Sequence, residues 1–172
     1  EKAAAVLKRS GFDPRSHAGK ALMDTLETYP RDELFHTPIE ELAPMAEAAM
    51  AAGERRAVRM LIRRDTYGRY VSVIVYLPRD RYNTAVRERF ARILQERLNG
   101  ESTEFTVRIN EATTARVHFV VHLPKGDEIP DVIADIKANI QYLHERILGE
   151  KLDIADPEIE RTYQVFLETW KE

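Results

Sequence analysis

Residues 55–97 read RRAVRMLIRRDTYGRYVSVIVYLPRDRYNTAVRERFARILQER, and this stretch decides the fold of the chain. Apolar and polar residues alternate with a period of two in two successive runs, a pattern typical of half-buried β-strands. The residues Asp65-Thr66-Tyr67-Gly68 separate the runs and predict a tight turn, because glycine readily adopts positive φ. After Pro78, apolar residues recur at helical spacing from Val86 to Leu98. The stretch therefore predicts strand, turn, strand and helix.

A second unit with the same order of elements follows. Residues 104–109 and 116–123 alternate with a period of two, and an amphipathic pattern from Ile129 to Leu148 predicts a long helix. The order from residue 57 is therefore ββαββα. The economical solution is an α+β fold, in which a four-stranded antiparallel sheet carries two helices on its apolar face. Helical N- and C-terminal segments flank this sandwich.

The other face of the sheet is predicted to be mostly polar. Its side chains are those of Arg59, Arg63, Ser72, Thr106, Arg108, Arg116, His118 and His122. Such a face is either solvated or meets a partner. His118 and His122 lie about 13 Å apart along one strand, which is too far for one metal ion, and we interpret them as solvated strand residues.

The N-terminal region is predicted to be helical from local start and stop signals. Ser16 caps a helix that runs to about Tyr29, and Pro30 begins the next one. Thr37-Pro38-Ile39-Glu40 has the pattern of a capping box, and Gly53 is expected to end the helix that follows. The predicted organisation is a helical linker at 1–54, an α/β sandwich at 55–149 and a C-terminal helix at 150–172.

The composition excludes several classes of protein. The chain of 172 residues has no cysteine, so it forms no disulfide and has no thiolate metal ligand. No apolar run reaches the roughly 18–20 residues that span a bilayer. No short motif for a nucleotide, a zinc protease or a nucleophilic serine is present. We therefore expect no catalytic residue, no metal site and no cofactor site, and we interpret the chain as a piece of a longer protein.

Arginine is the one strong compositional bias. Residues 55–97 contain 12 arginines and four acidic residues, although the whole chain has a net charge of −3. A nucleic-acid interface would explain this bias, but the order of elements is not that of an RNA-recognition motif. Most of these arginines are expected on outward strand and helix positions. Arg79-Asp80-Arg81 stands at a strand–helix corner, where a carboxylate or small anion could be gripped by two hydrogen bonds.

Three stretches carry a resemblance to a known family: Ser10–Phe35, Arg59–Leu94 and Glu104–Gly126. They resemble the N-terminal regulatory half of the large bacterial NAD-dependent glutamate dehydrogenases. The most specific piece runs from Arg63 to Thr84, which in that family lies in the second of several ACT-like domains. The resemblance covers about residues 5–130, and from about Ile133 onward the sequence departs from the family pattern.

The resemblance implies an ACT-like, ferredoxin-type domain with a preceding helical linker. It implies a non-catalytic regulatory or assembly module, in a cytoplasmic parent enzyme that converts glutamate to 2-oxoglutarate with NAD bound elsewhere. The implied partners are other domains of the parent chain, further copies in a homo-oligomer and an amino-acid effector, with no membrane. The alternatives are a stand-alone ACT-like domain that binds amino acids and, ranked below it, a nucleic-acid-binding α/β module.

Two corners of the sandwich are the predicted effector site or domain interface. The residues at the first corner are Arg63, Arg64, Asp65, Tyr67 and Gly68, and those at the second are Arg79, Asp80, Arg81, Tyr82 and Asn83.

Overall fold

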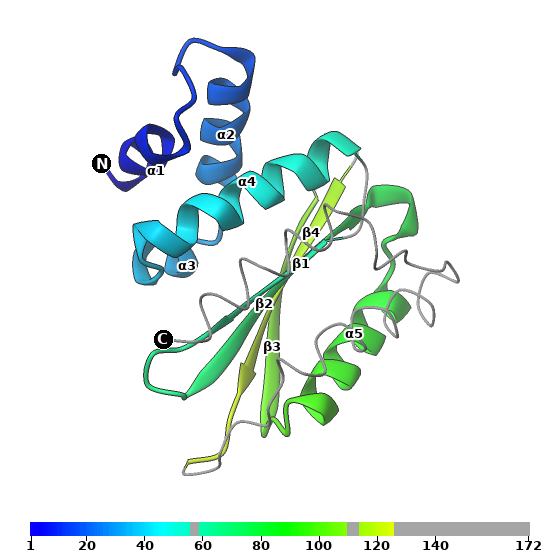
Figure 1. The fold of residues 1–172 in the computed structure, drawn as a ribbon. Coiled ribbons are helices and arrows are strands. Elements are labelled where there is room, and N and C mark those ends of the chain that lie inside the picture. The colour runs from blue at the N-terminus through cyan, green and yellow to red at the C-terminus, as the bar shows by residue number, and fades with distance from the viewer. Residues whose placement is uncertain (56–58, 110–113, 126–172) are drawn as a thin grey trace, which may run out of the picture. The chain divides into compact units, whose positions relative to one another are not determined.

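The computed structural model describes residues 1–55, 59–109 and 114–125 (Figure 1). The chain divides into two compact units, residues 1–55 and 56–172. The helix expected at 129–148 and the C-terminal helix expected at 150–172 lie outside the described residues. Within the described part, no helix is long and apolar enough to cross a membrane.

The first unit consists of helices that bury a small core of their own. They are α1 (Lys2–Ser10), α2 (His17–Thr28), α3 (Arg31–His36) and α4 (Ile39–Arg55). Both α1 and α2 pack against α4. Val6, Leu22, Leu26 and Leu42 are at most 1% exposed, which places them at the centre of this core.

Local capping determines where most of these helices begin and end. Ser16 caps α2 as predicted, because its Oγ accepts a hydrogen bond of 2.9 Å from the Gly19 backbone N–H. Pro30 stands at the start of α3, also as predicted. Gly11 adopts a φ of +74° at the end of α1, in the left-handed conformation that favours glycine.

Two predicted signals at the ends of α4 were wrong. The predicted capping box requires Thr37 as the N-cap. In the structure the Leu42 N–H donates the first helical hydrogen bond to the Pro38 carbonyl, so α4 starts one residue later. The Thr37 Oγ1 is therefore outside the helix, buried and without a hydrogen-bond partner. Gly53 does not end α4, which continues to Arg55. Glycine permits a positive φ without requiring one, and Gly53 does not adopt it.

The second unit contains the predicted four-stranded antiparallel sheet. Its elements are β1 (Arg59–Arg64), β2 (Tyr70–Pro78), the short 3-10 helix η1 (Arg79–Arg81), α5 (Thr84–Arg97), β3 (Ser102–Ile109) and β4 (Thr114–His122). The strand order is β1-β2-β4-β3, and each neighbouring pair is antiparallel. Since β2 and β3 both pair antiparallel with β4, they run in the same direction with β4 between them, and α5 connects them. The observed order, ββαββ, agrees with the first five elements of the predicted order ββαββα and is consistent with an ACT-like α+β fold.

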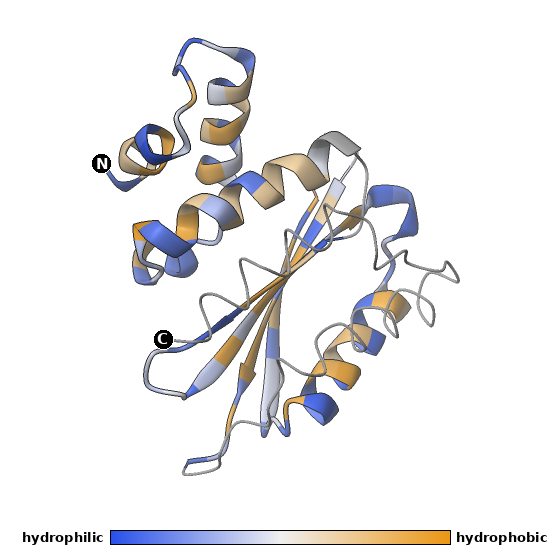
Figure 2. Cartoon of the chain, viewed as in Figure 1, coloured by the Kyte–Doolittle hydropathy of each residue, from blue (hydrophilic) through white to orange (hydrophobic). Residues whose placement is uncertain are grey.

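The apolar face of the sheet and α5 form the core of this unit. The register places Val73, Phe119 and Phe105 side by side on three strands. The ring of Phe90 on α5 lies 6.2 Å from that of Phe119, centroid to centroid, and Leu94 is buried as well. Figure 2 shows the hydrophobic colour concentrated along the middle of the sheet, with hydrophobic and hydrophilic segments alternating on α5.

One arginine of α5 differs from its predicted solvent position. The guanidinium of Arg87 lies 4.1 Å from the ring centroid of Phe105, and its side chain is only 20% exposed. Arg87 also forms an ion pair of 3.2 Å with Glu88. A long arginine side chain can cover an aromatic edge and keep its charge solvated, which helical periodicity alone does not predict. Arg92 is exposed, as predicted.

The polar face of the sheet departs most clearly from the sequence prediction. Ser72, Arg63 and His118 are 1%, 6% and 8% exposed, so they are not solvated strand residues. The Oγ of Ser72 and the Nε2 of His118 are hydrogen-bonded at 2.8 Å across β2 and β4. On β3, by contrast, Thr106 and Arg108 are exposed as expected. Ser72 and His118 on the two central strands are therefore buried, and they satisfy one another by a hydrogen bond.

A tyrosine and an arginine are neighbours on this same buried face. Tyr76 on β2 stands opposite Arg116 on β4. Burial raises the pKa of Tyr76 to about 12, and the hydrogen bond and positive charge of Arg116 offset only part of that effect. Tyr76 is therefore neutral at physiological pH.

Two glycines of the first unit make a matched test of backbone crowding. A Cβ at position 19 would clash with the Asp13 carbonyl oxygen, whereas one at Gly53 would meet no atom within 4 Å. We expect Gly19→Ala to lower the free energy of unfolding by about 1–3 kcal/mol. Gly53→Ala should raise it by about 0.5–1 kcal/mol, because alanine favours the helix. Chemical denaturation followed by circular dichroism measures both, and equal effects would contradict the close approach at Gly19.

Candidate functional site

The two predicted corners lie at opposite ends of β2. The first surrounds the turn that precedes Tyr70, and the second begins directly after Pro78. Eight residue steps along a strand span about 26 Å. The corners therefore form two separate sites, and no single small ligand could contact both.

The first corner is a β-hairpin turn between β1 and β2. The Asp65 N–H donates to the Tyr70 carbonyl at 2.9 Å, and the Gly68 N–H donates to the Asp65 carbonyl at 2.9 Å. Gly68 has a φ of +68°, the conformation that made glycine the expected residue here. Asp65 is thus held rigidly at the base of the turn.

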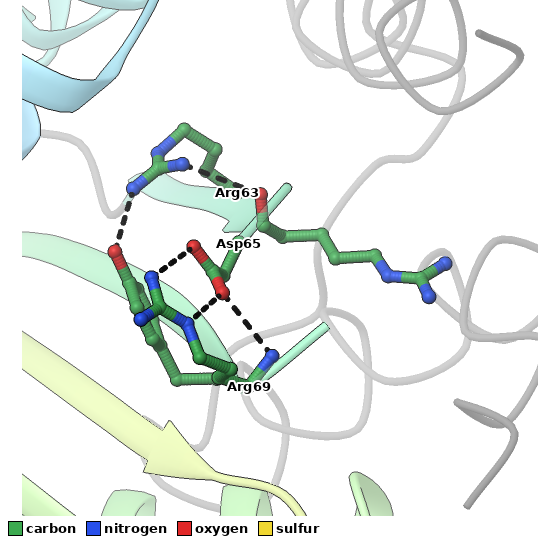
Figure 3. A network of polar contacts seen from close by, with 5 residues as sticks. Arg63, Asp65 and Arg69 are labelled. Carbon is green, nitrogen blue, oxygen red and sulfur yellow. Dashed lines mark hydrogen bonds and ion pairs between the residues drawn. The ribbon is translucent and has the colours of Figure 1, made fainter. Parts of the chain in front are cut away.

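Arg69, which follows the turn, binds the carboxylate of Asp65, which precedes it (Figure 3). The Arg69 Nε donates to Oδ2 at 2.8 Å and Nη2 donates to Oδ1 at 3.3 Å, while the Arg69 backbone N–H also donates to Oδ2. These hydrogen bonds and the positive charge lower the pKa of Asp65, although burial alone would raise it. Asp65, only 5% exposed, is therefore a charged structural anchor of the hairpin.

Arg63 is also used within the hairpin. Its Nη2 donates to the Tyr70 hydroxyl at 3.4 Å, and its Nη1 donates to the Arg64 carbonyl at 3.3 Å (Figure 3). The guanidinium lies 6.0 Å from the Tyr70 ring centroid. Because these contacts engage Arg63 and its side chain is buried, it is not an outward-facing anion ligand.

The outward-facing part of the turn is an aromatic and basic tip. Tyr67 is 81% exposed, and the guanidinium of Arg69 lies 5.2 Å from its ring centroid. Arg64, the last residue of β1, is exposed as well. Arg69 was missing from the predicted site, although its position four residues after Asp65 was a readable signal for an ion pair across a short turn. We define the hairpin tip as Arg64, Tyr67 and Arg69.

The second corner leads from β2 into α5. The Asn83 Oδ1 accepts a hydrogen bond of 2.9 Å from the Val86 N–H, so Asn83 is the N-cap of α5. The Tyr82 N–H closes η1 by donating to the Arg79 carbonyl at 3.2 Å. Asp80 and Arg81 have interaction partners of their own. This corner therefore builds the strand-to-helix connection, and its role in binding stays a prediction.

The described residues contain no group of three or more histidine, aspartate or glutamate side chains arranged to hold a metal ion. His118 and His122 lie on the same face of β4, as predicted. His118 is bonded to Ser72, and His122 lies 3.4 Å from the carboxylate of Glu104 on β3. His118 is therefore hydrogen-bonded to a neighbouring strand, whereas the contact of His122 with Glu104 is not a hydrogen bond.

The fold and the hairpin define an ACT-like α+β domain that follows a helical unit. Residues 59–148 match the family model for the glutamate dehydrogenase ACT2 domain, and residues 1–55 match that for glutamate dehydrogenase helical motif 1. The chain belongs to the glutamate dehydrogenase family. This confirms the resemblance inferred from the sequence, but the match continues past Ile133, so the departure from the family expected at that point was wrong.

Three curated relatives are NAD-specific glutamate dehydrogenases. The protein of Pseudomonas aeruginosa is 42% identical over 126 residues, which is 73% of this chain and 8% of the relative. The protein of Halomonas elongata is 42% identical over 117 residues, or 68% of this chain and 7% of the relative. The protein of Mycobacterium tuberculosis is 43% identical over 120 residues, or 70% and 7%. The aligned part of the chain thus spans less than a tenth of the length of each relative.

Replacing Asp65 should change how stability depends on pH. A carboxyl group whose pKa is lowered by folding stabilises the native state above its unfolded pKa, and that contribution is lost as the pH falls through the folded pKa. We expect Asp65→Asn to unfold at a lower denaturant concentration than the parent chain at pH 7. The difference should shrink below about pH 4, where the carboxyl group of the unfolded parent chain becomes protonated.

Denaturation midpoints measured between pH 7 and pH 3 test this expectation. Asp24→Asn is a matched control, because Asp24 is exposed on α2 and should give no comparable difference. A constant difference between Asp65→Asn and the parent chain at every pH would show that the charge of Asp65 does not stabilise the hairpin.

Proposed function

We propose that this chain is a non-catalytic regulatory and assembly module of a large NAD-dependent glutamate dehydrogenase. The whole enzyme would oxidise glutamate to 2-oxoglutarate, and NAD would bind in a part of it other than this chain. One observation carries the proposal: the chain matches helical motif 1 and the ACT2 domain, while it aligns with less than a tenth of each NAD-specific relative. Its partners would be other domains of the parent chain and further copies of it.

The use of polar groups supports an assembly role. Asp65 and Arg69 close the hairpin, Ser72 and His118 join two central strands, and Asn83 caps α5. Each of these hydrogen bonds is made within the domain and stabilises its fold. A module whose polar residues stabilise its own geometry is suited to hold neighbouring parts of a large enzyme at fixed positions.

The absence of turnover is the direct test of the non-catalytic role. We expect the isolated chain to form no NADH when it is incubated with glutamate and NAD, because the catalytic machinery would belong to the rest of the enzyme. Absorbance of NADH is the readout, and a complete NAD-specific glutamate dehydrogenase is the positive control. Hydride transfer by the chain alone, proportional to its concentration, would overturn the proposal.

The second candidate function is binding of an amino-acid effector. One observation favours it: the hairpin tip presents exposed Arg64 and Arg69 beside Tyr67, and such a group could hold a carboxylate. Arg69 already pairs with Asp65, however, so Arg64 would have to bind the carboxylate of the effector.

Calorimetry with a panel of amino acids separates the two functions. The assembly role predicts no saturable heat with any of them. The effector role predicts a saturable heat that Arg64→Ala abolishes and that Arg92→Ala, an exposed arginine on α5, leaves unchanged.

A further inference from the structure

The sheet has two edges that differ sharply in exposure. On β1, the residues from Met60 to Arg63 are buried. On β3, most residues are exposed, and the large apolar side chains of Phe105 and Ile109 are 45% and 44% exposed. In the described part of the chain, β3 pairs with β4 on one side and no strand lies on its other side.

The β3 edge lacks most of the usual protection against pairing with another strand, since its only charged residues, Glu104 and Arg108, are of opposite sign. Exposed edges in monomeric proteins are commonly interrupted by proline, lysine or a bulge. Ser102–Ile109 is an eight-residue strand with neither proline nor lysine, and its register with β4 is continuous. Such an edge is a template for a further strand.

The hydrogen-bonding pattern of the sheet indicates which β3 groups face outward. The Leu123 N–H donates to the Arg69 carbonyl, so the odd-numbered residues of β4 bond to β2. The even-numbered residues of β4 then bond to their β3 partners, which are also even-numbered. The odd-numbered β3 residues therefore present their backbone N–H and C=O groups to the outer edge. They are Thr103, Phe105, Val107 and Ile109.

The sequence of β3 is complementary to itself when it is paired antiparallel about Thr106. In that register Glu104 stands opposite Arg108 of a second copy, and Phe105 stands opposite Val107. The two-fold axis generates each pair twice. Registers centred on Glu104 or Arg108 would place like charges opposite one another, which is unfavourable.

We propose that β3 pairs antiparallel with β3 of a second copy of this chain, centred on Thr106, so that two sheets join into one. The outward groups of Phe105 and Val107 supply backbone hydrogen bonds, and Glu104 with Arg108 sets the register. This inference deepens the assembly role proposed above, and it specifies the partner surface. Its test measures self-association, so it is independent of the NADH assay.

A single introduced cysteine tests the register directly. The chain contains no cysteine, so Thr106→Cys carries one thiol. Directly opposite residues at a non-hydrogen-bonded position have Cα atoms about 4.5 Å apart, within the roughly 4.4–6.8 Å that a disulfide bridges. We expect Thr106→Cys to form a disulfide-linked dimer on mild oxidation.

The matched control is Ser102→Cys, on the same strand and face. In the proposed register its two thiols lie about 26 Å apart, since eight residue steps separate them. This variant should remain monomeric on a non-reducing gel. A covalent dimer of Ser102→Cys forming as fast as that of Thr106→Cys would overturn the register.

Charge reversal tests the same contact without oxidation. Glu104→Arg should raise the dissociation constant about tenfold in sedimentation equilibrium, because two attractive pairs become repulsive. The double variant Glu104→Arg/Arg108→Glu should restore the affinity of the parent chain. Glu27→Arg, an exposed residue of α2, is the control for an equal change in charge and should have no effect.

Three results would overturn the proposal. One is a parent chain that stays monomeric at every concentration measured. Another is a dimer that Glu104→Arg does not weaken, and the third is a double variant that associates no better than Glu104→Arg. Circular dichroism of each variant confirms that its sheet is intact. With any of these results, the absence of NADH formation would still support the non-catalytic role.

Discussion

The pairing of β2 with β4 is the contact on which the rest of the second unit depends. It extends over nine residue pairs, from Tyr70 opposite His122 to Pro78 opposite Thr114. This register determines which side chains face α5 and which face the opposite side. It also moves β3 to an edge of the sheet, because β4 occupies the place beside β2. The edge position of β3 follows from this pairing, and the nine-residue length of β2 separates the two corners.

Burial of Ser72, His118 and Tyr76 at the centre of the sheet is tolerated because each has a polar partner. Ser72 and His118 satisfy one another across the two central strands, and Arg116 is a neighbour of the buried Tyr76 hydroxyl. The hairpin follows the same principle, since Asp65 stays charged beside Arg69. Arg63, Arg69 and Arg87 therefore make contacts within the domain, and these contacts do not require a polyanionic ligand.

The candidate site was partly predictable. The turn from Asp65 to Gly68 could be identified from local chemistry, and Asn83 could be identified as a helix cap. The partnership of Asp65 with Arg69 was accessible from their spacing but was not inferred. The burial of Arg63 could not be inferred, because it depends on what surrounds the second face of the sheet. The family was recognisable from stretches of specific sequence, which the matches to helical motif 1 and the ACT2 domain confirmed.

The sequence by itself determined the described elements of this protein: the helices, the caps of α2 and α5, the two hairpins, and the apolar face that packs on α5. These features depend on residues within a few positions of one another, where periodicity and backbone preference act. Only the tertiary structure decided the strand order, the burial of Ser72, Arg63 and His118, and the exposure of β3. Those properties depend on contacts between residues far apart in the chain. An alternating strand has the same pattern whether its polar face meets water or protein.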